Sequence, residues 1–161
     1  MVTTKIIEKE SSKETASNHY YYAVGRRKEA SARVRLYVST TEEKIIVQDK
    51  SYEKGVIMVN QRPIEDYFIG ETAKKRYLEP FRTTNNLGRF VTTIKIVGGG
   101  LTGQLEAVIH GLARALDTVD HEKYHSILKK RGFLTRDSRM KQRRKAGFAG
   151  KARKKKQSPK R

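Results

Sequence analysis

Three patterns in this chain have residue types and spacings that could support chemistry. Gly98-x-Gly100-x-x-Gly103 has the spacing of a dinucleotide-binding turn, where glycines let the backbone approach a phosphate. His121-Glu122-Lys123-Tyr124-His125 has the HExxH spacing of zinc proteases, where two histidines hold the metal and the glutamate acts as general base. The third pattern is clustered arginine and lysine, which suits nucleic-acid phosphates.

The glycine motif lies in the wrong context for a nucleotide cofactor. A dinucleotide fingerprint needs a strand after its helix, with an acid that binds the ribose about 20 residues on. Here the expected helix is followed by another helix and then by a cationic segment. Glycines at a helix N-terminus still present unpaired N–H groups, so a nucleic-acid phosphate at Gly98, Gly99 and Gly100 is one interpretation. A tightly packed turn is the other.

The HExxH motif also lacks its usual surroundings. It lies in the first turns of its expected helix, Asp137 is the only acid after it, and the sixteen cations that follow would oppose a divalent ion. His121 and His125 are therefore interpreted as surface or helix-packing residues. The chain has no cysteine, which excludes a thiolate zinc site and a cysteine nucleophile. We expect no metal, no cofactor and no enzymatic activity.

The positive charge of the chain is concentrated at one end. The net charge is +19, from 36 Lys and Arg against 17 Asp and Glu, and it divides into +4 for the first 128 residues and +15 for the last 33. From residue 135 onward the only sizeable apolar side chains are Met140 and Phe148. Such a segment cannot bury enough apolar area to fold by itself, so it should be extended and bind a polyanion. A merely solvated charge run or a localisation signal is the alternative.

Other partners and compartments fit the sequence less well. An anionic membrane surface would call for an amphipathic apolar face or a lipid anchor, and neither is visible. No apolar run approaches the length of a membrane span, and the N-terminal residues lack a secretory signal pattern. We expect a cytoplasmic protein without a membrane partner or a small-molecule substrate.

The chain is expected to divide into three parts: a disordered polar leader over 1–19, a globular domain over 20–134, and an extended basic tail over 135–161. Within the domain, apolar and polar residues alternate over 29–38, which predicts a half-buried strand. Two β-rich runs, 45–47 and 56–59, are separated by a polar turn-like segment and suggest a hairpin. Residues 90–97 are apolar on both sides, as in a central strand.

Helices are expected in the spaces between these strands. Pro63 opens one or two helical turns that end at Gly70, and a modest helix follows over 71–81, stopped at Pro80. Leu101, Leu105, Val108, Ile109, Leu112 and Leu116 recur at helical spacing. A last helix runs from an Asp120 N-cap to about Arg131, with Tyr124, Ile127 and Leu128 inward and Gly132 as its stop. This order favours an α+β two-layer sandwich over a doubly wound sheet.

A second basic set lies at the first predicted strand. It comprises Arg26, Arg27, Lys28, Arg33 and Arg35, preceded by Tyr20, Tyr21 and Tyr22. Cations with aromatic residues nearby suit phosphate contacts and base stacking. An ordinary solvated strand face is the alternative.

Four separated blocks of the chain resemble the small-subunit ribosomal protein S9 family. They are Gly25-Arg26-Arg27-Lys28 with Ala32-Arg33-Val34, then Val59-Asn60 with Pro63 and Tyr67-Phe68, then the run from Gly98 to Leu116, and finally Leu134 to Lys145. The resemblance covers roughly residues 20–161. It implies a fold like the second domain of ribosomal protein S5, in the head of the small subunit, with a structural and non-catalytic role.

The resemblance also implies partners and site residues: small-subunit rRNA, neighbouring proteins of the subunit head, and tRNA in the peptidyl site, whose anticodon arm the tail reaches. The expected rRNA-binding residues are Arg26, Arg27, Lys28, Arg33, Arg35, Gly98, Gly99, Gly100, Arg136, Arg139, Arg143, Arg144, Lys145, Lys151, Arg153, Lys154, Lys155 and Lys156. Lys160 and Arg161 are the expected tRNA contacts. A basic DNA-compacting module, with the tail as a nonspecific arm, is the rival hypothesis.

The chain departs from the family pattern in three places. These are the leader through about Asn18, an extra stretch from Lys44 to Lys54, and the final residues from Gln157 to Arg161. Bacterial members of the family usually carry an aromatic residue after that Gln and Ser directly before the final Lys-Arg pair, where this chain has Pro159. The substitution affects the expected geometry of the last contact but not its two charges.

Overall fold

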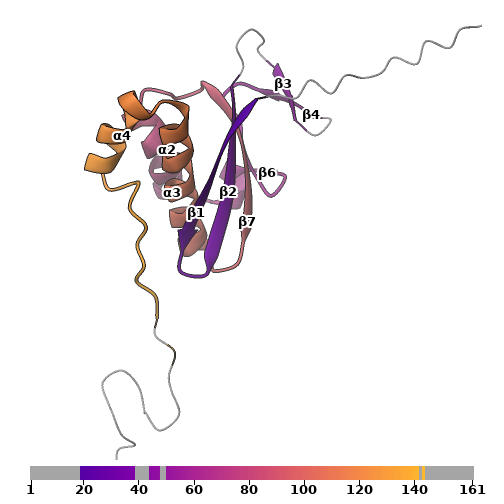
Figure 1. The fold of residues 1–161 in the computed structure, drawn as a ribbon. Coiled ribbons are helices and arrows are strands. Elements are labelled where there is room, and N and C mark those ends of the chain that lie inside the picture. The colour runs from indigo at the N-terminus through magenta and orange to yellow at the C-terminus, as the bar shows by residue number, and fades with distance from the viewer. Residues whose placement is uncertain (1–18, 39–43, 48–49, 142, 144–161) are drawn as a thin grey trace, which may run out of the picture.

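The computed structural model describes residues 19–38, 44–47, 50–141 and 143, which form seven strands and four helices (Figure 1). The strands are β1 (Tyr20–Arg27), β2 (Ala30–Val38), β3 (Lys44–Val47), β4 (Lys50–Glu53), β5 (Ile57–Val59), β6 (Arg62–Pro63) and β7 (Phe90–Val97). The helices are α1 (Ile64–Tyr67), α2 (Glu71–Thr83), α3 (Leu101–Val119) and α4 (His121–Lys130). None of these helices is long and apolar enough to cross a membrane.

Five strands form one mixed sheet in the order β1-β2-β7-β5-β6. All neighbours are antiparallel except β5 and β7, which are parallel. Helices α2, α3 and α4 lie together on one side of this sheet (Figure 1). A mixed sheet with α2, α3 and α4 on one side agrees with the expected α+β class and not with a doubly wound sheet.

The alternation predicted for 29–38 is confirmed in β2. Ala32, Val34 and Leu36 are fully buried against the helices, whereas Arg33 and Arg35 are exposed on the opposite, outer face. Strand β7 is the central strand, as predicted, and it pairs with β2 over its whole length. The strand before β2 in the chain, β1, was not predicted. It pairs with β2 along its whole length, from Tyr20 to Arg27.

The hairpin predicted between 45–47 and 56–59 is wrong. Strand β3 instead pairs with β4, from Lys44 opposite Glu53 to Val47 opposite Lys50, and forms a separate two-stranded sheet. Strand β5 joins the main sheet through β7, and β6 continues from it. The stretch from Lys44 to Lys54 that departs from the family pattern is therefore this separate hairpin and the residue that follows it.

The helix predicted to stop at Pro80 continues to Thr83, and Pro80 is buried inside it. Proline removes a single backbone hydrogen bond, to the residue four positions earlier, and burial of Pro80 and Phe81 in the core offsets that loss. Two side chains predicted to face the core are exposed instead. Leu101 is the first residue of α3, and Ile127 lies on the exposed side of α4.

Both predicted ends of α4 are confirmed. The Asp120 carboxylate accepts a hydrogen bond of 3.1 Å from the Lys123 N–H, which is an N-cap. At the other end Gly132 has a φ of 76°, and the Phe133 N–H donates to the Leu128 carbonyl at 3.1 Å. This Schellman arrangement satisfies the last carbonyls and directs the chain away from the helix.

Strand β1 and helix α3 approach so closely that only glycine fits at the crossing. A Cβ on Gly25 would lie 1.9 Å from the Ala107 carbonyl oxygen and 2.3 Å from the Gly111 nitrogen. A Cβ on Gly111 would lie 2.7 Å from Val34 Cγ2. Because the Gly25 neighbours are backbone atoms, they cannot give way without moving the helix.

We expect Gly25→Ala to lower the free energy of unfolding by at least about 1–3 kcal/mol, the usual cost of overpacking a core. Urea denaturation followed by circular dichroism measures this change. Gly100→Ala is the matched control, because Gly100 has a negative φ of −108° and a methyl group added there would have no atom within 4 Å. Equal stability of the two variants would contradict the role of the crossing.

Candidate nucleic-acid interface

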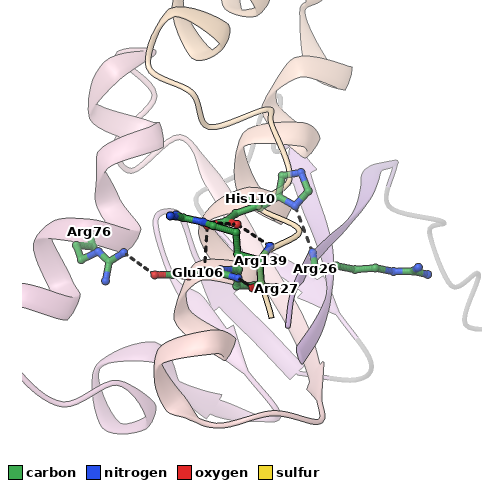
Figure 2. Close-up of polar contacts among 7 residues, drawn as sticks. Arg26, Arg27, Arg76, Glu106, His110 and Arg139 are labelled. Carbon is green, nitrogen blue, oxygen red and sulfur yellow. Dashed lines mark hydrogen bonds and ion pairs between the residues drawn. The ribbon is translucent and has the colours of Figure 1, made fainter. Parts of the chain in front are cut away.

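The end of β1 and the turn that follows it carry three of the predicted cations, and the structure separates them into two kinds. Arg26 and Lys28 are exposed, and Lys28 has a positive φ of 51° at the turn. The Arg27 side chain between them is only 12% exposed. Figure 2 shows the Arg26 side chain directed away from the group that surrounds Arg27.

Arg27 is held by two carboxylates from distant parts of the chain (Figure 2). Its Nε donates to Glu106 Oε2 on α3 at 2.6 Å, and its terminal nitrogen lies 3.1 Å from Asp137 Oδ2. The guanidinium also donates to the Arg139 carbonyl. A second cation also pairs with Glu106: a terminal nitrogen of Arg76, on α2, lies 3.4 Å from Glu106 Oε1. One arginine thus joins the end of β1, α3 and the beginning of the basic tail.

Both carboxylates of this cluster are stabilised in the charged form. Burial raises the pKa of Glu106, but its hydrogen bonds and charge interactions with Arg27 and Arg76 outweigh that effect and the pKa is lowered overall. The pKa of Asp137 lies far below its usual range, chiefly because Arg139 donates to it at 2.7 Å from its side chain and at 2.9 Å from its backbone N–H. Both groups are therefore anionic at neutral pH.

Neither carboxylate was singled out from the sequence. Asp137 had a usable signal, because it is the only acid among the last 33 residues and it lies within a run of cations. Glu106 had no such signal, because a glutamate in an amphipathic helix is ordinary. Its role depends on the crossing of α3 over β1.

His110 lies beside this cluster and is half-buried. Its Nδ1 accepts a hydrogen bond of 3.3 Å from the Arg26 backbone N–H, as Figure 2 shows. Burial, together with the nearby positive charges of Arg114 and Arg136, lowers the pKa of His110 in spite of its backbone hydrogen bonds. A neutral imidazole is the form that can accept this bond, and it helps to fix the end of β1.

The glycine turn before α3 lies against the β1–β2 turn. A Cβ on Gly98 would lie 2.6 Å from the Glu29 carbonyl oxygen, and one on Gly99 would lie 2.9 Å from the Ala30 Cβ. Both residues have positive φ values, 77° and 66°. These contacts favour the packed-turn interpretation for Gly98 and Gly99, whereas Gly100 has open space around it. The turn and the cations Arg26 and Lys28 nevertheless lie at one end of the molecule.

The outer face of the sheet carries a second group of cations. Arg33 and Arg35 of β2 are exposed there, and Lys95 of β7 pairs directly with Arg33 in the strand register. These three side chains line a cavity of about 450 Å³, which the hairpin side chains Val47 and Tyr52 also line. No acid lines this cavity among the described residues. Lys95 was missed from the sequence, although the alternation in β7 places it on the outer face.

Two aromatic residues lie at the other end of β1. The Arg35 guanidinium lies 5.2 Å from the centre of the Tyr20 ring, a cation–π contact, and Tyr20 and Tyr22 are both exposed. Their exposure agrees with the expected combination of cations and aromatic residues at this strand.

The predicted tail residues lie partly outside the described structure. Arg136, Arg139 and Arg143 are exposed. The other predicted rRNA-binding residues of the tail and the two predicted tRNA contacts lie outside the described residues: Arg144, Lys145, Lys151, Arg153, Lys154, Lys155, Lys156, Lys160 and Arg161. The anchoring of Asp137 on Arg27 shows where the tail leaves the folded body.

We expect Glu106→Gln to lower the free energy of unfolding by about 1.5 kcal/mol, the lower end of the range for a hydrogen bond to a charged group, because Glu106 is partly exposed to water. Urea denaturation at neutral pH measures this change. The matched control is Glu65→Gln, since Glu65 pairs with Lys74 at 2.6 Å on an open surface. Such exposed pairs contribute about 0–1 kcal/mol, so a larger effect in the control would contradict the assignment.

The lowered pKa values of Glu106 and Asp137 predict how stability depends on pH. In this acidic range the unfolded chain binds more protons than the folded chain, so the contribution is complete above about pH 5 and is lost as the pH falls through the folded pKa values. As the pH falls below about 5, the double variant Glu106→Gln/Asp137→Asn should therefore lose less stability than the parent. Thermal unfolding at a series of pH values measures it, and an equal loss in both proteins would count against the cluster.

Comparison with known proteins shows which family the chain belongs to. The family model described as ribosomal protein S9/S16 matches residues 25–161. The small ribosomal subunit protein uS9 of Maridesulfovibrio salexigens is 44% identical over 134 residues, which cover 83% of this chain and 92% of that protein. The proteins of the same name from Solidesulfovibrio magneticus and Dehalococcoides mccartyi are 43% and 41% identical over 134 and 131 residues, 83% and 81% of this chain and 92% and 88% of those proteins. The chain belongs to the ribosomal protein S9 family.

Proposed function

We propose that this protein is a structural component of the head of the small ribosomal subunit, where it binds the subunit's rRNA and where its tail contacts the tRNA of the peptidyl site. The observation that carries the proposal is the family match over residues 25–161, which includes both the folded body and the basic tail. The similar proteins named above are small-subunit proteins. As a ribosomal protein the chain is structural rather than catalytic, and it acts in the ribosome in the cytoplasm.

The distribution of paired and exposed cations supports a role for the outer sheet face in RNA binding. Arg33 and Lys95 are directly opposite each other on neighbouring strands, which is unfavourable for like charges. An acid between them would relieve this repulsion, but none lines the cavity among the described residues. A phosphate group bridging the two side chains would relieve it as well, and RNA supplies phosphates at regular spacing.

The end of the molecule near the β1–β2 turn forms the second proposed RNA surface. Arg26, Lys28, Arg136 and Arg139 are exposed here. Gly98 and Gly99 pack against the β1–β2 turn, and Gly100 has open space in which a phosphate can approach the backbone. Arg27 belongs to the same surface, but its guanidinium is already bound by Glu106 and Asp137. Its proposed contribution is to hold the beginning of the tail in place beside the exposed cations.

The proposal covers all three expected parts of the chain, including residues that the structure does not describe. In it, residues 20–134 form a body like the second domain of ribosomal protein S5, residues 1–19 form a polar leader, and residues 135–161 thread through rRNA as an extended tail. The charge of the tail supports this, because most of the excess positive charge of the chain lies in it. The residues from Lys151 to Lys156 would line the RNA path, and Lys160 and Arg161 would reach the tRNA.

We expect the full chain to bind a fragment of small-subunit rRNA with an affinity that falls steeply as salt rises. If about eight tail cations meet phosphates, the log–log slope on single-stranded RNA is about −6. Filter binding over a range of salt concentrations measures this slope. A slope near zero would refute phosphate neutralisation as the basis of binding.

The same measurement tests the sheet face. Replacing Arg33 and Arg35 by Gln should make the slope less steep by about 1.4, if each arginine meets one phosphate of single-stranded RNA. The control variant Lys74→Gln/Lys75→Gln removes two exposed cations from α2, on the helical side of the sheet, and should leave the slope unchanged. Equal effects of the two double variants would show that the outer face has no special role.

The proposed tRNA contact is tested with ribosomes that carry Lys160→Ala/Arg161→Ala. Two charges add little to an rRNA interface of many contacts, so the variant should still sediment with small subunits in a sucrose gradient. Dissociation of tRNA from the peptidyl site should become faster, because two charge contacts with the anticodon arm are lost. An unchanged dissociation rate would contradict this part of the proposal.

A further inference from the structure

We propose that Asp117, His121 and His125 form a binding site for a divalent transition-metal ion, with Zn²⁺ as the best fit, at the junction of α3 and α4. The site is independent of the RNA-binding surfaces. It uses the two histidines of the HExxH motif, which the proposed function leaves without a role. The third ligand comes from before the motif, whereas zinc proteases take theirs from after it.

The three side chains converge on one point. His121 Nδ1 and His125 Nδ1 lie 3.2 Å and 3.0 Å from the same Asp117 oxygen, Oδ1. The two imidazole rings have their centres 4.3 Å apart, and one ligand atom from each of the three residues lies within 4.8 Å of the other two. Zn²⁺ holds nitrogen and oxygen ligands at about 2.0–2.1 Å in a tetrahedron, which places neighbouring ligand atoms about 3.3 Å apart. The observed nitrogen–oxygen distances are close to this value.

A bend in the chain creates this convergence. Asp117 and His125 are eight residues apart, which would separate them by about 12 Å along a continuous helix. Helix α3 ends at Val119, Asp120 has an extended conformation with φ −152° and ψ 95°, and α4 begins at His121. The bend brings the Asp117 carboxylate over the first turns of α4, beside both histidines.

The bend is fixed without the help of a metal. The Asp120 side chain accepts the Lys123 N–H at 3.1 Å and lies 3.0 Å from the Lys123 ammonium group. Asp120 is therefore occupied as the cap of α4, and Asp117 is the acid that meets the histidines. Because the backbone already holds this geometry, a metal ion would bind with little rearrangement of the chain.

The ligand types select the class of metal. Two imidazoles and one carboxylate suit Zn²⁺ and its transition-metal neighbours, whereas Mg²⁺ and Ca²⁺ prefer sites made only of oxygen. The His121 side chain is 68% exposed, so solvent can reach the site and a water molecule can fill the fourth position. The Asp117 carboxylate also attracts the cation locally, which opposes the repulsion from the net positive charge of the protein. A bound ion would hold α4, and with it the start of the tail, to the end of α3.

Cobalt titration of the untagged full chain tests the site directly. After treatment with a chelator, the protein is titrated with Co²⁺, whose visible absorption reports tetrahedral coordination, and Zn²⁺ is then added in competition. We expect one equivalent of Co²⁺ to bind and one equivalent of Zn²⁺ to displace it. No binding, or binding with only the weak absorption of octahedral Co²⁺, would overturn the proposal.

Single substitutions connect the signal to the three residues. His125→Gln and Asp117→Asn should each weaken Zn²⁺ binding by at least about tenfold, the loss that even an outer-shell partner of a metal ligand can cause. Two controls keep the ligands intact: His19→Gln changes a histidine outside the site, and Glu122→Gln changes the glutamate of the motif. Undiminished binding in the ligand variants, or an equal loss in the His19 control, would place the metal elsewhere and overturn the assignment.

A second measurement separates the loss of a ligand from the loss of the fold. Zn²⁺ that binds only the folded chain should raise the Tm of the parent and of both controls. The Asp117→Asn variant keeps the side-chain size and should unfold cooperatively, with a Tm that the same concentration of Zn²⁺ raises less than in the parent. A Zn²⁺-induced rise in this variant as large as in the parent would contradict the site.

Discussion

The backbone contact between Gly25 and Gly111 sets the geometry on which the other features of the body depend. With no side chain on either residue, α3 lies against β1 at the distance of two backbones. Glu106 is five residues before Gly111 on the helix, and Arg27 is two residues after Gly25 on the strand. The close crossing therefore brings their charged groups to 2.6 Å. A wider crossing would separate this pair and remove the support for the start of the tail.

The position of each cation decides whether it is bound within the protein or presented outside. Arg27 is mostly buried, and burying a guanidinium is unfavourable unless charged partners replace its water. Glu106 and Asp137 fulfil that condition. The cations of the outer face are exposed, so water solvates them and they need no acid. A chain with a large positive charge can thus fold stably by placing a few acids where cations are buried, and its exposed cations remain available to a polyanion.

Local patterns in the sequence predicted the elements that local interactions determine. Strand β2 follows from its alternation, and both ends of α4 follow from Asp120 and Gly132, whose hydrogen bonds are made within a few residues. The parallel pairing of β5 with β7 and the contact of Asp137 with Arg27 join segments far apart in the chain, and no local pattern encodes them. For the same reason the equivalent neighbours Arg26, Arg27 and Lys28 could not be told apart: only the fold determines which one is buried.

The β3–β4 hairpin divides the outer face of the sheet into two regions. Tyr37 and Val91 are paired in register on that face and are buried with Ile45 and Val47 of the hairpin in a small second core. Farther along the same strands, Arg33 and Lys95 are exposed. Without the hairpin, the first pair would present apolar surface to water, so the hairpin and these two residues stabilise each other. Its Tyr52 side chain also lines the cavity beside the cations. The stretch that departs from the family pattern therefore places an aromatic side chain beside Arg33 and Lys95 and makes this part of the outer face a cavity.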